Sequence, residues 1–520
     1  MSVQFFITTA IDYTNGAPHI GHAYEKVLAD VIARYHRLQG EKVFFLTGVD
    51  QHGQKVQQSA EKQGLPPEQF VAGVTEQFIK LWDKLDVRFD AWAETTTPLH
   101  QQCVQGMLQR LWDEKLIYKD KQSGYYSVRQ EQFLTDKERK ANGEFGPEWG
   151  QVDFREEENY YFKLSDNKDW LQGFLQSRPD FVTPSFRQAE LVNAVEKLSG
   201  DLCISRPKSR LSWGIELPFD RDYVNYVWFD ALTNYISFIG YNPTKNYAEQ
   251  SAEFRKRWPA LHVIGKDILV PAHGVYWPIM LKALGFPDDQ MPKLLVHGWW
   301  NNSGAKMSKS LGNVVDPDAL ADKYGPEALR YYLMSDIATG KDADFSEERL
   351  ISRYNADLAN SIGNLLNRTL NMAQRYREGR LDAFAESSAA VTIRDEATEI
   401  VRNFNDWMAK YSIDAGLTAA GYLASRCNQI IDREAPWNLA KDPKKAPELS
   451  ALLRALGESL RIIAILVSPV LPNAARRICS QLNWHAELTL ADAVWGKLPA
   501  DHTLGKPTPI FPRIEAPGGA

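Results

Sequence analysis

Two histidines three residues apart stand near the start of the chain, in the segment Pro18-His19-Ile20-Gly21-His22. Residues at this spacing lie on one face of a helix, so both imidazoles point the same way. A helix N-terminus presents free backbone N–H groups and favours anions. If a helix begins at this segment, the pair is suited to stabilising a charged phosphoryl group.

The elements around this segment are those of a strand, a turn and a helix. Residues 4–11 are rich in Phe, Ile and Thr and are predicted to form a buried strand. Apolar residues at helical spacing then predict a helix that stops at Gly40, with Pro18 in its first turn. Residues 42–49 form a second apolar strand, which makes a βαβ unit and a parallel sheet.

Ligands of such sheets bind at the carboxyl ends of the strands, where Tyr13 and Asp50 fall. The first turn has no G-x-G-x-x-G, which disfavours a dinucleotide oxidoreductase. Gly21 leaves room for a flat ring such as adenine to approach the backbone.

A second motif, Lys306-Met307-Ser308-Lys309-Ser310, lies in the second half of the chain. Together, in this order, the histidine and lysine motifs resemble the two signatures of the class I aminoacyl-tRNA synthetases. The residues around them resemble the methionyl-tRNA synthetase family over nearly the whole chain. The resemblance implies an α/β, Rossmann-type parallel-sheet catalytic domain, split by a connective insertion and followed by an all-α helix-bundle anticodon-binding domain.

Composition alone leaves the function open. The chain has 520 residues, enough for two to four domains, and a net charge of −6, so a tRNA partner would need a local basic face. The four cysteines are scattered and fit neither a disulfide framework nor a metal site, which favours a reducing cytoplasm. No apolar run is long enough to span a membrane, so no membrane partner is expected.

The pattern of strands and helices predicts five consecutive regions. They are the first half of the catalytic domain (1–115), the connective insertion (116–222), the second half of the catalytic domain (223–300), the signature loop with a connecting unit (301–350), and the helical anticodon-binding domain (351–520). Within them we predict short strands at 124–128 and 159–164, one strand at 294–300, and a bundle helix at 452–470. No barrel domain follows the bundle, so a monomer is expected.

The insertion carries a zinc knuckle in many relatives, but Ser127 and Gln130 stand where one cysteine pair would fall. Structural zinc needs four ligands. We therefore expect a short, zinc-free form, in which aromatic residues fill the space instead. The candidates are Tyr125, Phe133, Trp149 and Phe162.

The resemblance implies that methionine attacks the α-phosphate of ATP, with Mg²⁺ arriving on the nucleotide. It assigns catalysis to His19, His22, Lys306 and Lys309. It assigns ATP binding to Gly21, Gly265, Asp267 and Lys309. Lysines on a Gly/Ser-flanked loop could close over the β- and γ-phosphates as point charges.

Ten positions match residues that line the methionine pocket of the family: Ala10, Ile11, Tyr13, Asp50, Trp228, Ala231, Leu232, Tyr235, Ile268 and His273. Asp50 resembles the carboxylate that holds the α-ammonium group, although Asp is also a favoured helix N-cap. By spacing alone, Trp228 and Tyr235 fit an ordinary core. One extra residue near 270–272 leaves His273 either in the pocket or displaced along its helix.

The bundle contains the residues implied to read the tRNA. Asn364 and Arg368 resemble the family's anticodon-reading helix, and Trp437 resembles its aromatic stacking site. Stacking and edge hydrogen bonds are how single-stranded RNA is read. Alternatively, Trp437 is a buried residue of the bundle.

Methionine–tRNA ligation, with methionine, ATP and a methionine tRNA as partners, is therefore the expected function. One alternative is another class I synthetase, but the cysteine enzyme needs a zinc built from cysteines that are absent here. The branched-chain enzymes need an editing domain larger than this insertion. The other alternative is a non-catalytic tRNA-binding paralogue, which would be expected to lose a motif histidine or lysine; all four are present.

Overall fold

The first strand of the chain lies in the middle of a parallel sheet of seven strands. The computed structural model describes residues 4–127, 132–134, 136–140, 142–302, 304–307, 314–382 and 386–515. The sheet runs in the order β2-β3-β1-β13-β14-β8, and β4 pairs with β3 as well. Its strands are β1 (Gln4–Thr9), β2 (Asp12–Tyr13), β3 (Lys42–Asp50), β4 (Ala91–Glu94), β8 (Val182–Thr183), β13 (Leu261–Gly265) and β14 (Lys293–His297).

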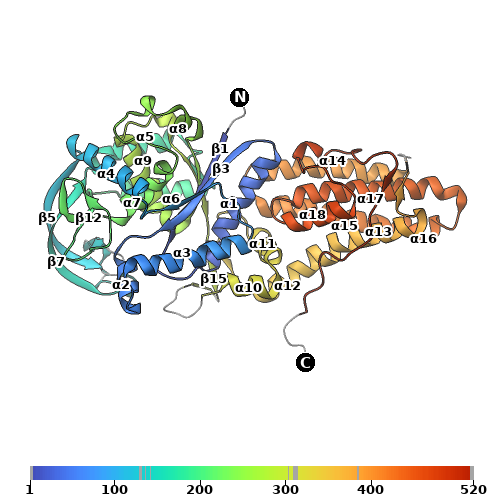
Figure 1. Ribbon diagram of the computed structural model, residues 1–520, viewed down its shortest axis with the longest axis horizontal. Helices are drawn as coiled ribbons and strands as arrows, with labels where there is room; N and C mark the ends of the chain where they lie inside the picture. Colours follow the sequence, from blue (N-terminus) through green and yellow to red (C-terminus); the bar gives the residue numbers. More distant parts are fainter. Residues whose placement is uncertain are drawn as a thin grey trace.

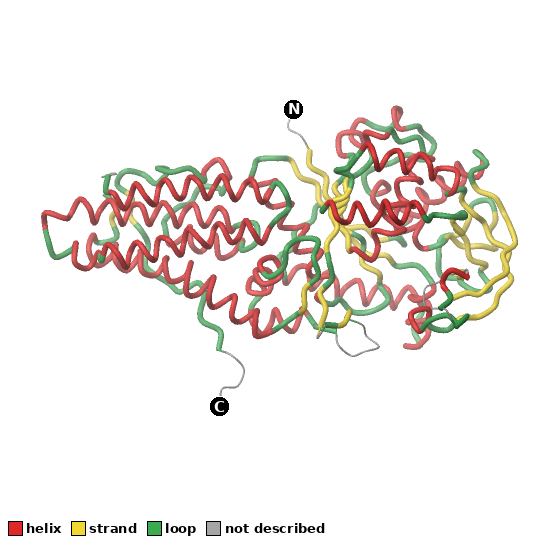
Figure 2. The backbone as a smooth tube through the Cα atoms, turned by 180° about the vertical axis from the view of Figure 1, so that it is seen from behind, coloured by secondary structure: helices red, strands yellow, loops and turns green. Residues whose placement is uncertain are grey.

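Successive side chains of a strand point to opposite faces of the sheet, and here each face is covered by its own apolar core. Ile7 and Phe45 belong to one apolar core, and their neighbours Phe6 and Leu46 belong to another. The first core includes α1 (Ile20–Leu38) and α3 (Pro67–Lys84). The second includes α4 (Pro98–Asp113), α7 (Val227–Ser237) and α9 (Trp277–Ala283). The predicted α/β class is confirmed, and Figure 2 shows the yellow strands near the middle of the molecule.

The helix after β1 begins two residues later than predicted. His19 is its N-cap, so Pro18 precedes the helix instead of lying in its first turn. The prediction was wrong because an imidazole nitrogen takes the capping role that an oxygen usually has. The predicted stop is close to the observed one, since α1 ends at Leu38 and Gly40 follows with φ of 83°.

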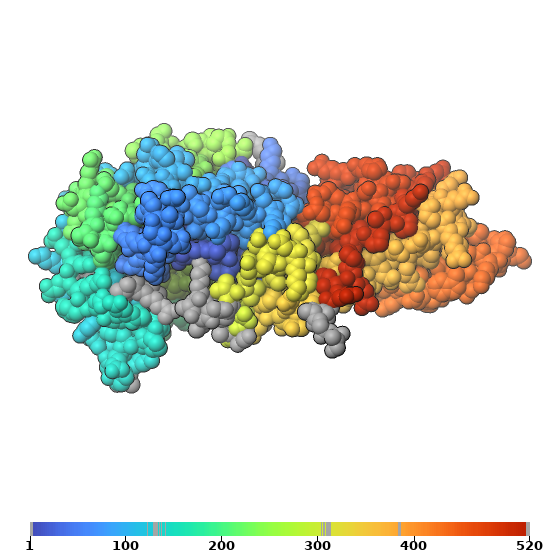
Figure 3. All heavy atoms as spheres, turned by 60° about the horizontal axis from the view of Figure 1, so that its bottom comes forward, coloured from blue at the N-terminus to red at the C-terminus, as the bar shows by residue number. Residues whose placement is uncertain are grey.

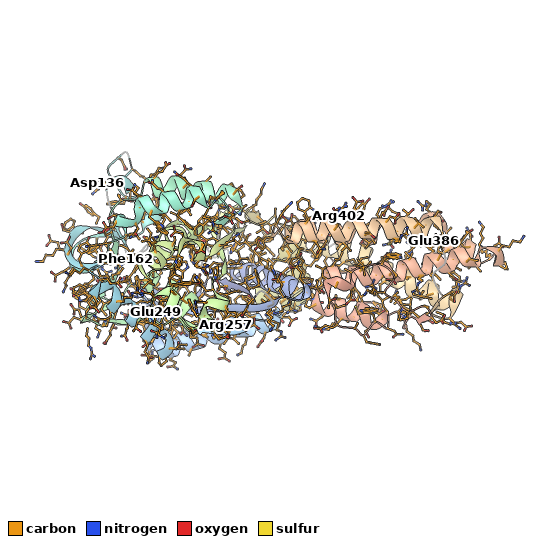
Figure 4. All side chains as sticks on the ribbon, turned by 90° about the horizontal axis from the view of Figure 1, so that it is seen from above. Asp136, Phe162, Glu249, Arg257, Glu386 and Arg402 are labelled. Atoms are coloured by element: carbon orange, nitrogen blue, oxygen red, sulfur yellow. The ribbon has the colours of Figure 1, made fainter. Side chains whose placement is uncertain are left out.

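The insertion is built on two long antiparallel strands, β5 (Ile117–Ser127) and β7 (Val152–Phe162), which pair along their whole length. The predicted strands were too short, because polar residues on the exposed face hid the alternation. Phe162 does not fill a zinc-like site: it is buried in the catalytic body, 6.4 Å from the ring of Phe229 (Figure 4). The remaining elements are α2 (Gln54–Gln63), β6 (Gln132–Leu134), α5 (Lys168–Ser177), α6 (Ser185–Glu196), β9 (Leu202–Cys203), β10 (Ser205–Pro207), β11 (Glu216–Leu217), β12 (Asp220–Asn225) and α8 (Ala252–Arg257).

The strand predicted at 294–300 is interrupted. β14 ends at His297, and a separate strand, β15 (Trp300–Asn302), follows. Gly298 lies between them, where an added Cβ would stand 2.1 Å from the carbonyl oxygen of Lys341. β15 pairs with β16 (Ala305–Lys306) and β17 (Ala343–Asp344), and α10 (Pro317–Tyr324) and α11 (Pro326–Ser335) complete the connecting unit. Figure 3 shows this yellow unit between the blue helices and the orange-red bundle.

A helix bundle forms the other end of the elongated molecule (Figure 1). Its elements are α12 (Glu347–Arg353), a π-helical segment (Tyr354–Gly363), α13 (Asn364–Arg377), α14 (Ser388–Met408), α15 (Ile413–Glu434), α16 (Pro436–Leu439), α17 (Ala446–Val467) and α18 (Pro472–Gln481). The helix predicted at 452–470 is α17, which begins six residues earlier and ends three earlier. Its residues from Leu449 to Val467 are all buried, so α17 is the central helix of the bundle.

A buried arginine joins the two halves. Arg330 of α11 donates to Asp30 Oδ2 at 2.7 Å and to three carbonyl oxygens, those of Leu85 (2.9 Å), Pro469 (3.0 Å) and Val470 (2.8 Å). Both side chains of the Arg330–Asp30 pair are fully buried. Because a guanidinium offers five donors in a fixed plane, one side chain ties α1, the end of α3 and the end of α17 together.

Within the described parts of the chain, no helix is both long and apolar enough to cross a membrane.

The Arg330 junction predicts a large effect on stability. Arg330→Met should lower the free energy of unfolding by about 3–5 kcal/mol, because buried carbonyl groups and Asp30 lose their partner. Arg402→Met is the matched control, since Arg402 lies on the outer surface of α14 and is exposed (Figure 4). Urea unfolding of both variants would check this; equal, small losses would contradict the role of Arg330.

Candidate functional site

The carboxyl ends of four neighbouring parallel strands, β3, β1, β13 and β14, lie side by side. The chain passes from β1 to β3 on one side and places β13 on the other, so the strand order reverses at β1. Open α/β sheets bind ligands in the crevice at such a point. Two adjoining cavities occupy it, and both are lined by residues of the turn after β1 and the turn after β13. The shared residues are Ala10, Ile11, Tyr13, Asp267 and Ile268.

The two histidines cap α1 reciprocally. His19 Nδ1 accepts a hydrogen bond from the backbone N–H of Gly21, and His22 Nδ1 accepts one from the N–H of His19, both at 3.1 Å. A ring nitrogen that accepts carries no proton, so the N–H of each neutral ring is at Nε2. The rings stack with centroids 3.8 Å apart. Two donors thus lie side by side at a helix N-terminus, as the spacing predicts.

The histidine cavity, of about 290 Å³, is the first of the two. It brings together five residues predicted to serve ATP: His19, Gly21, His22, Gly265 and Asp267. An added Cβ on Gly21 would stand 3.0 Å from the His19 ring, so this glycine makes room for the histidine as well as for a ligand. Gly265 is close to Asp267, whose Oδ1 would lie 2.8 Å from an added Cβ.

The lysine motif is only partly described. Lys309 lies outside the described residues, and Lys306 is described through its backbone in β16. Met307, between them in sequence, lines the histidine cavity. The described end of the motif therefore reaches the cavity that holds the two histidines.

The aromatic cavity, of about 500 Å³, is the second. All ten residues predicted to bind methionine line it: Ala10, Ile11, Tyr13, Asp50, Trp228, Ala231, Leu232, Tyr235, Ile268 and His273. They come from the turn after β1, the end of β3, α7 and the segment after β13. Spacing alone could not separate this arrangement from a core, because Tyr235 and Leu232 are also buried members of the second core.

His273 lies in the aromatic cavity despite the extra residue before it. The segment Leu269–Tyr276 is π-helical, a wider turn that accommodates an additional residue, and Val270 has non-helical angles. His273 Nδ1 donates to the Ile268 carbonyl at 2.9 Å, and its Nε2 accepts from the Tyr235 hydroxyl at 2.7 Å. Burial lowers the pKa of His273 to about 4, so the ring is neutral.

Asp50 ends β3, and its backbone oxygen accepts hydrogen bonds from both the N–H and the hydroxyl of Thr14. The helix that follows, α2, begins after Gly53, which is its N-cap. Asp50 is therefore not the helix cap that the sequence left open. Its side chain is buried and lines the aromatic cavity.

A network of charged side chains that was not predicted from the sequence lies beside the cavities. Lys26 Nζ is fully buried and donates to the Ala10 carbonyl (2.9 Å), Asp12 Oδ1 (2.8 Å) and Glu25 Oε1 (2.9 Å). Burial raises the pKa of Asp12 to about 7, against the opposing effect of Lys26. Lys26 is four residues after His22, so helical spacing from the histidine pair could have identified it.

The same network extends to His297 at the end of β14. His297 Nδ1 contacts the Gly298 carbonyl at 2.8 Å, and Nε2 contacts Glu25 Oε2 at 3.1 Å. The side chains of His297, Glu25, Lys26 and Asp12 are thus linked by successive contacts, and Asp12, Glu25 and His297 also line the histidine cavity.

A separate polar group lies in the bundle. Asn364 Nδ2 and Arg368 Nη1 both donate to Asn428 Oδ1 of α15, at 3.1 and 3.5 Å, and Arg368 also pairs with Asp432 at 2.6 Å. Trp437 follows the end of α15, and 43% of it is exposed. The alternative that Trp437 is a buried core residue is wrong.

Comparison with known proteins places these observations in a family. A family profile described as "tRNA synthetases class I (M)" matches residues 5–144 and 149–370. A methionine–tRNA ligase of Caldanaerobacter subterraneus is 40% identical over 99% of this chain and 80% of its own length. One of Halalkalibacterium halodurans is 39% identical over 98% of this chain and 78% of its own length.

Solved structures are also similar to this chain. The methionyl-tRNA synthetase of Mycobacterium tuberculosis, in complex with methionyl-adenylate, superposes with a TM-score of 0.91 at 35% identity. The match covers 98% of this chain and all of that one. The free form of that protein gives a TM-score of 0.86 at 32% identity, covering 99% of each chain.

The neutral His273 predicts a pH dependence of stability. Its pKa is lower in the folded than in the unfolded protein, so the unfolded chain takes up a proton first as the pH falls through 6.5. The wild type should therefore lose about 2 kcal/mol between about pH 7.5 and about pH 5 from this residue. Urea unfolding of wild type and His273→Gln measures it: the stability difference between them should narrow by this amount, and a constant difference would contradict the assignment.

Proposed function

The chain belongs to the class I tRNA synthetases and is a methionine–tRNA ligase, and from this we propose which of its residues perform each step. The enzyme activates methionine with ATP, forming methionyl-adenylate and pyrophosphate, and transfers methionine to the 3′ end of its tRNA. The observation that carries the assignment of residues is the adjoining pair of cavities. One is lined by the histidine pair and the other by all ten residues expected around methionine.

In the activation step, the methionine carboxylate attacks the α-phosphorus and pyrophosphate leaves. The protein must hold the two reactants in line and stabilise the negative charge that develops on the phosphoryl oxygens. We assign this to the Nε2–H groups of His19 and His22, because their Nδ1 atoms are occupied by the helix cap. A donor fixed in advance by its own hydrogen bond needs little reorganisation when the charge forms.

We assign Lys306 and Lys309 to the β- and γ-phosphates, and Gly265 and Asp267 to the adenosine. Support comes from Gly265 and Asp267 lining the histidine cavity together with Met307 of the lysine motif. Mg²⁺ enters with ATP, bound mainly by phosphate oxygens and water, and neutralises phosphate charge. In the described ranges there is no group of three or more His, Cys, Asp or Glu side chains arranged to hold a metal ion.

Methionine is assigned to the aromatic cavity. Asp50 is assigned to the α-ammonium group through a charge-assisted hydrogen bond. The thioether is assigned to Trp228, Tyr235 and the neutral His273, since sulfur packs favourably against aromatic rings. The Tyr235 hydroxyl and both His273 nitrogens are engaged with each other or with Ile268. The part of the pocket wall that these two side chains form is therefore weakly polar.

In the second step, the 2′-hydroxyl of the terminal ribose of tRNA attacks the carbonyl carbon of the adenylate, so that an ester forms, the acyl–phosphate bond breaks and AMP leaves. The anticodon is assigned to Asn364, Arg368 and Trp437. Asn364 and Arg368 are one helical turn apart and both contact Asn428, so they act from one surface. Trp437 offers an exposed ring for stacking on a base.

We further propose that the enzyme works as a monomer in the cytoplasm and without structural zinc. The four cysteines lie far apart in sequence, and burial raises the pKa of Cys103 and Cys427 to about 12. At the tip of the insertion, the Ser127 hydroxyl donates to the Trp149 carbonyl at 2.6 Å. The Tyr125 ring contacts Phe145 and Phe154, with Arg139 stacked on it, and these contacts support the proposal. Gln130 lies outside the described residues.

The amino-acid specificity is testable by ATP–pyrophosphate exchange. Methionine should support exchange, while leucine and valine should give a kcat/KM lower by at least about tenfold, because the pocket is shaped for an unbranched thioether. A reaction without amino acid gives the background. Exchange with leucine or valine but not with methionine would refute the pocket assignment.

The anticodon assignment is testable at Trp437. Trp437→Ala should lower kcat/KM for tRNA charging by about ten- to a hundredfold, from the loss of a base-stacking platform. Exchange and melting temperature should stay near the parent values, because the ring is half-exposed. Trp407→Ala is the control, since Trp407 is also a bundle tryptophan with 43% exposure. Equal charging by the two variants would remove the role of Trp437.

A further inference from the structure

Several buried hydrogen bonds hold residues 50–53, which are the end of β3 and the turn that follows it. Gln51 in this turn is 2% exposed and uses every polar group of its side chain and its N–H. Its N–H donates to Thr95 Oγ1 at 2.9 Å, and its side-chain amide donates to Thr75 Oγ1 at 3.0 Å. Its side-chain oxygen accepts from the Thr96 hydroxyl at 2.6 Å. These contacts fix the turn to α3 and to the end of β4.

The connective insertion contacts the same residues through Trp213. The indole N–H of Trp213 donates to the backbone carbonyl of Gln51 at 2.6 Å, and the Trp213 carbonyl accepts from the N–H of Gly53 at 3.3 Å. The indole also lies against the His52 ring, with centroids 5.5 Å apart. Gln57 Oε1 accepts from the Trp213 N–H at 3.2 Å, which holds this part of the insertion on α2.

A third set of bonds joins the same turn to the helix of the aromatic cavity. His52 Nδ1 contacts Asp230 Oδ2, and His100 Nε2 contacts Asp230 Oδ1, each at 2.7 Å. Asp230 lies on α7, between Trp228 and Ala231, and is 1% exposed. The turn therefore has a defined position relative to α7, and a shift of the turn cannot leave the aromatic cavity unchanged.

We propose that Trp213 is a positioning residue for methionine binding. Through the Gln51 carbonyl it fixes the peptide next to Asp50, and so aims the Asp50 carboxylate at the methionine ammonium group. The inference rests on the proposed role of Asp50. The connective insertion then contributes to the amino-acid site, because its contact with residues 50–53 determines the affinity for methionine. A charge-assisted bond is sensitive to such alignment, because small misplacements of a binding group have large effects.

The test is Trp213→Phe, which keeps an aromatic ring beside His52 and removes the indole N–H together with the second ring. The KM for methionine in pyrophosphate exchange should rise about tenfold, while kcat at saturating methionine and the KM for ATP stay unchanged. Trp258→Phe is the matched control, since the Trp258 indole N–H also donates to a backbone carbonyl, that of Gln290, at 2.7 Å. A merely structural role for Trp213 predicts no rise in the KM for methionine beyond that of Trp258→Phe, and that result would overturn the proposal.

A double-mutant cycle with Asp50→Asn separates this inference from the assignment on which it rests. If Trp213 acts through Asp50, the increase in KM caused by Trp213→Phe should largely disappear in the Asp50→Asn background. If Asp50→Asn raises the KM for methionine but Trp213→Phe does not, the positioning role is wrong and the Asp50 assignment stands. If Asp50→Asn leaves that KM unchanged, the ammonium assignment itself fails. Fully additive effects would also overturn the positioning role.

Discussion

The arrangement of the whole molecule depends on the fully buried contact between Arg330 and Asp30. Asp30 is in the middle of α1, and α1 carries the histidine pair at its N-terminus. The same guanidinium binds the carbonyl groups that end α17 of the bundle. At 1.5 Å per residue, the 19-residue helix is about 28 Å long. One helix therefore connects the histidine pair, to which we assign the phosphate chemistry, with the domain that we assign to the anticodon.

The two cavities of the candidate site have different surroundings. Beside the histidine cavity, Lys26 is buried and each of its three donors has a partner. Around the aromatic cavity, by contrast, His273 is neutral and its two nitrogens are bound within the protein. A buried charge is costly unless it is paired. The two environments thus suit two different ligand parts, a polyanion on one side and a thioether on the other.

Much of the fold and of the candidate site could be predicted from the sequence, and the features that could not be predicted have physical reasons. Two strands of the sheet, the presence of the helix between them and the positions around the aromatic cavity other than His273 were predicted, because periodicity and the family motifs are local in sequence. Pro18 was misplaced because a histidine side chain replaced the usual cap. Trp213 and Asp230 could not be identified, since their bonds to residues 50–53 join segments more than 150 residues apart. The position of His273 depended on a π-helical turn, which no periodicity rule anticipates.

The π-helical segment Tyr354–Gly363 has a consequence for orientation. It joins α12, beside the connecting unit, to α13, which carries Asn364 and Arg368. A π-helical turn takes about one residue more than an α-helical turn. Each such turn rotates the azimuth of α13 by about 100° relative to an uninterrupted α-helix. The segment before α13 therefore sets the direction in which Asn364 and Arg368, the residues that we assign to the anticodon, face.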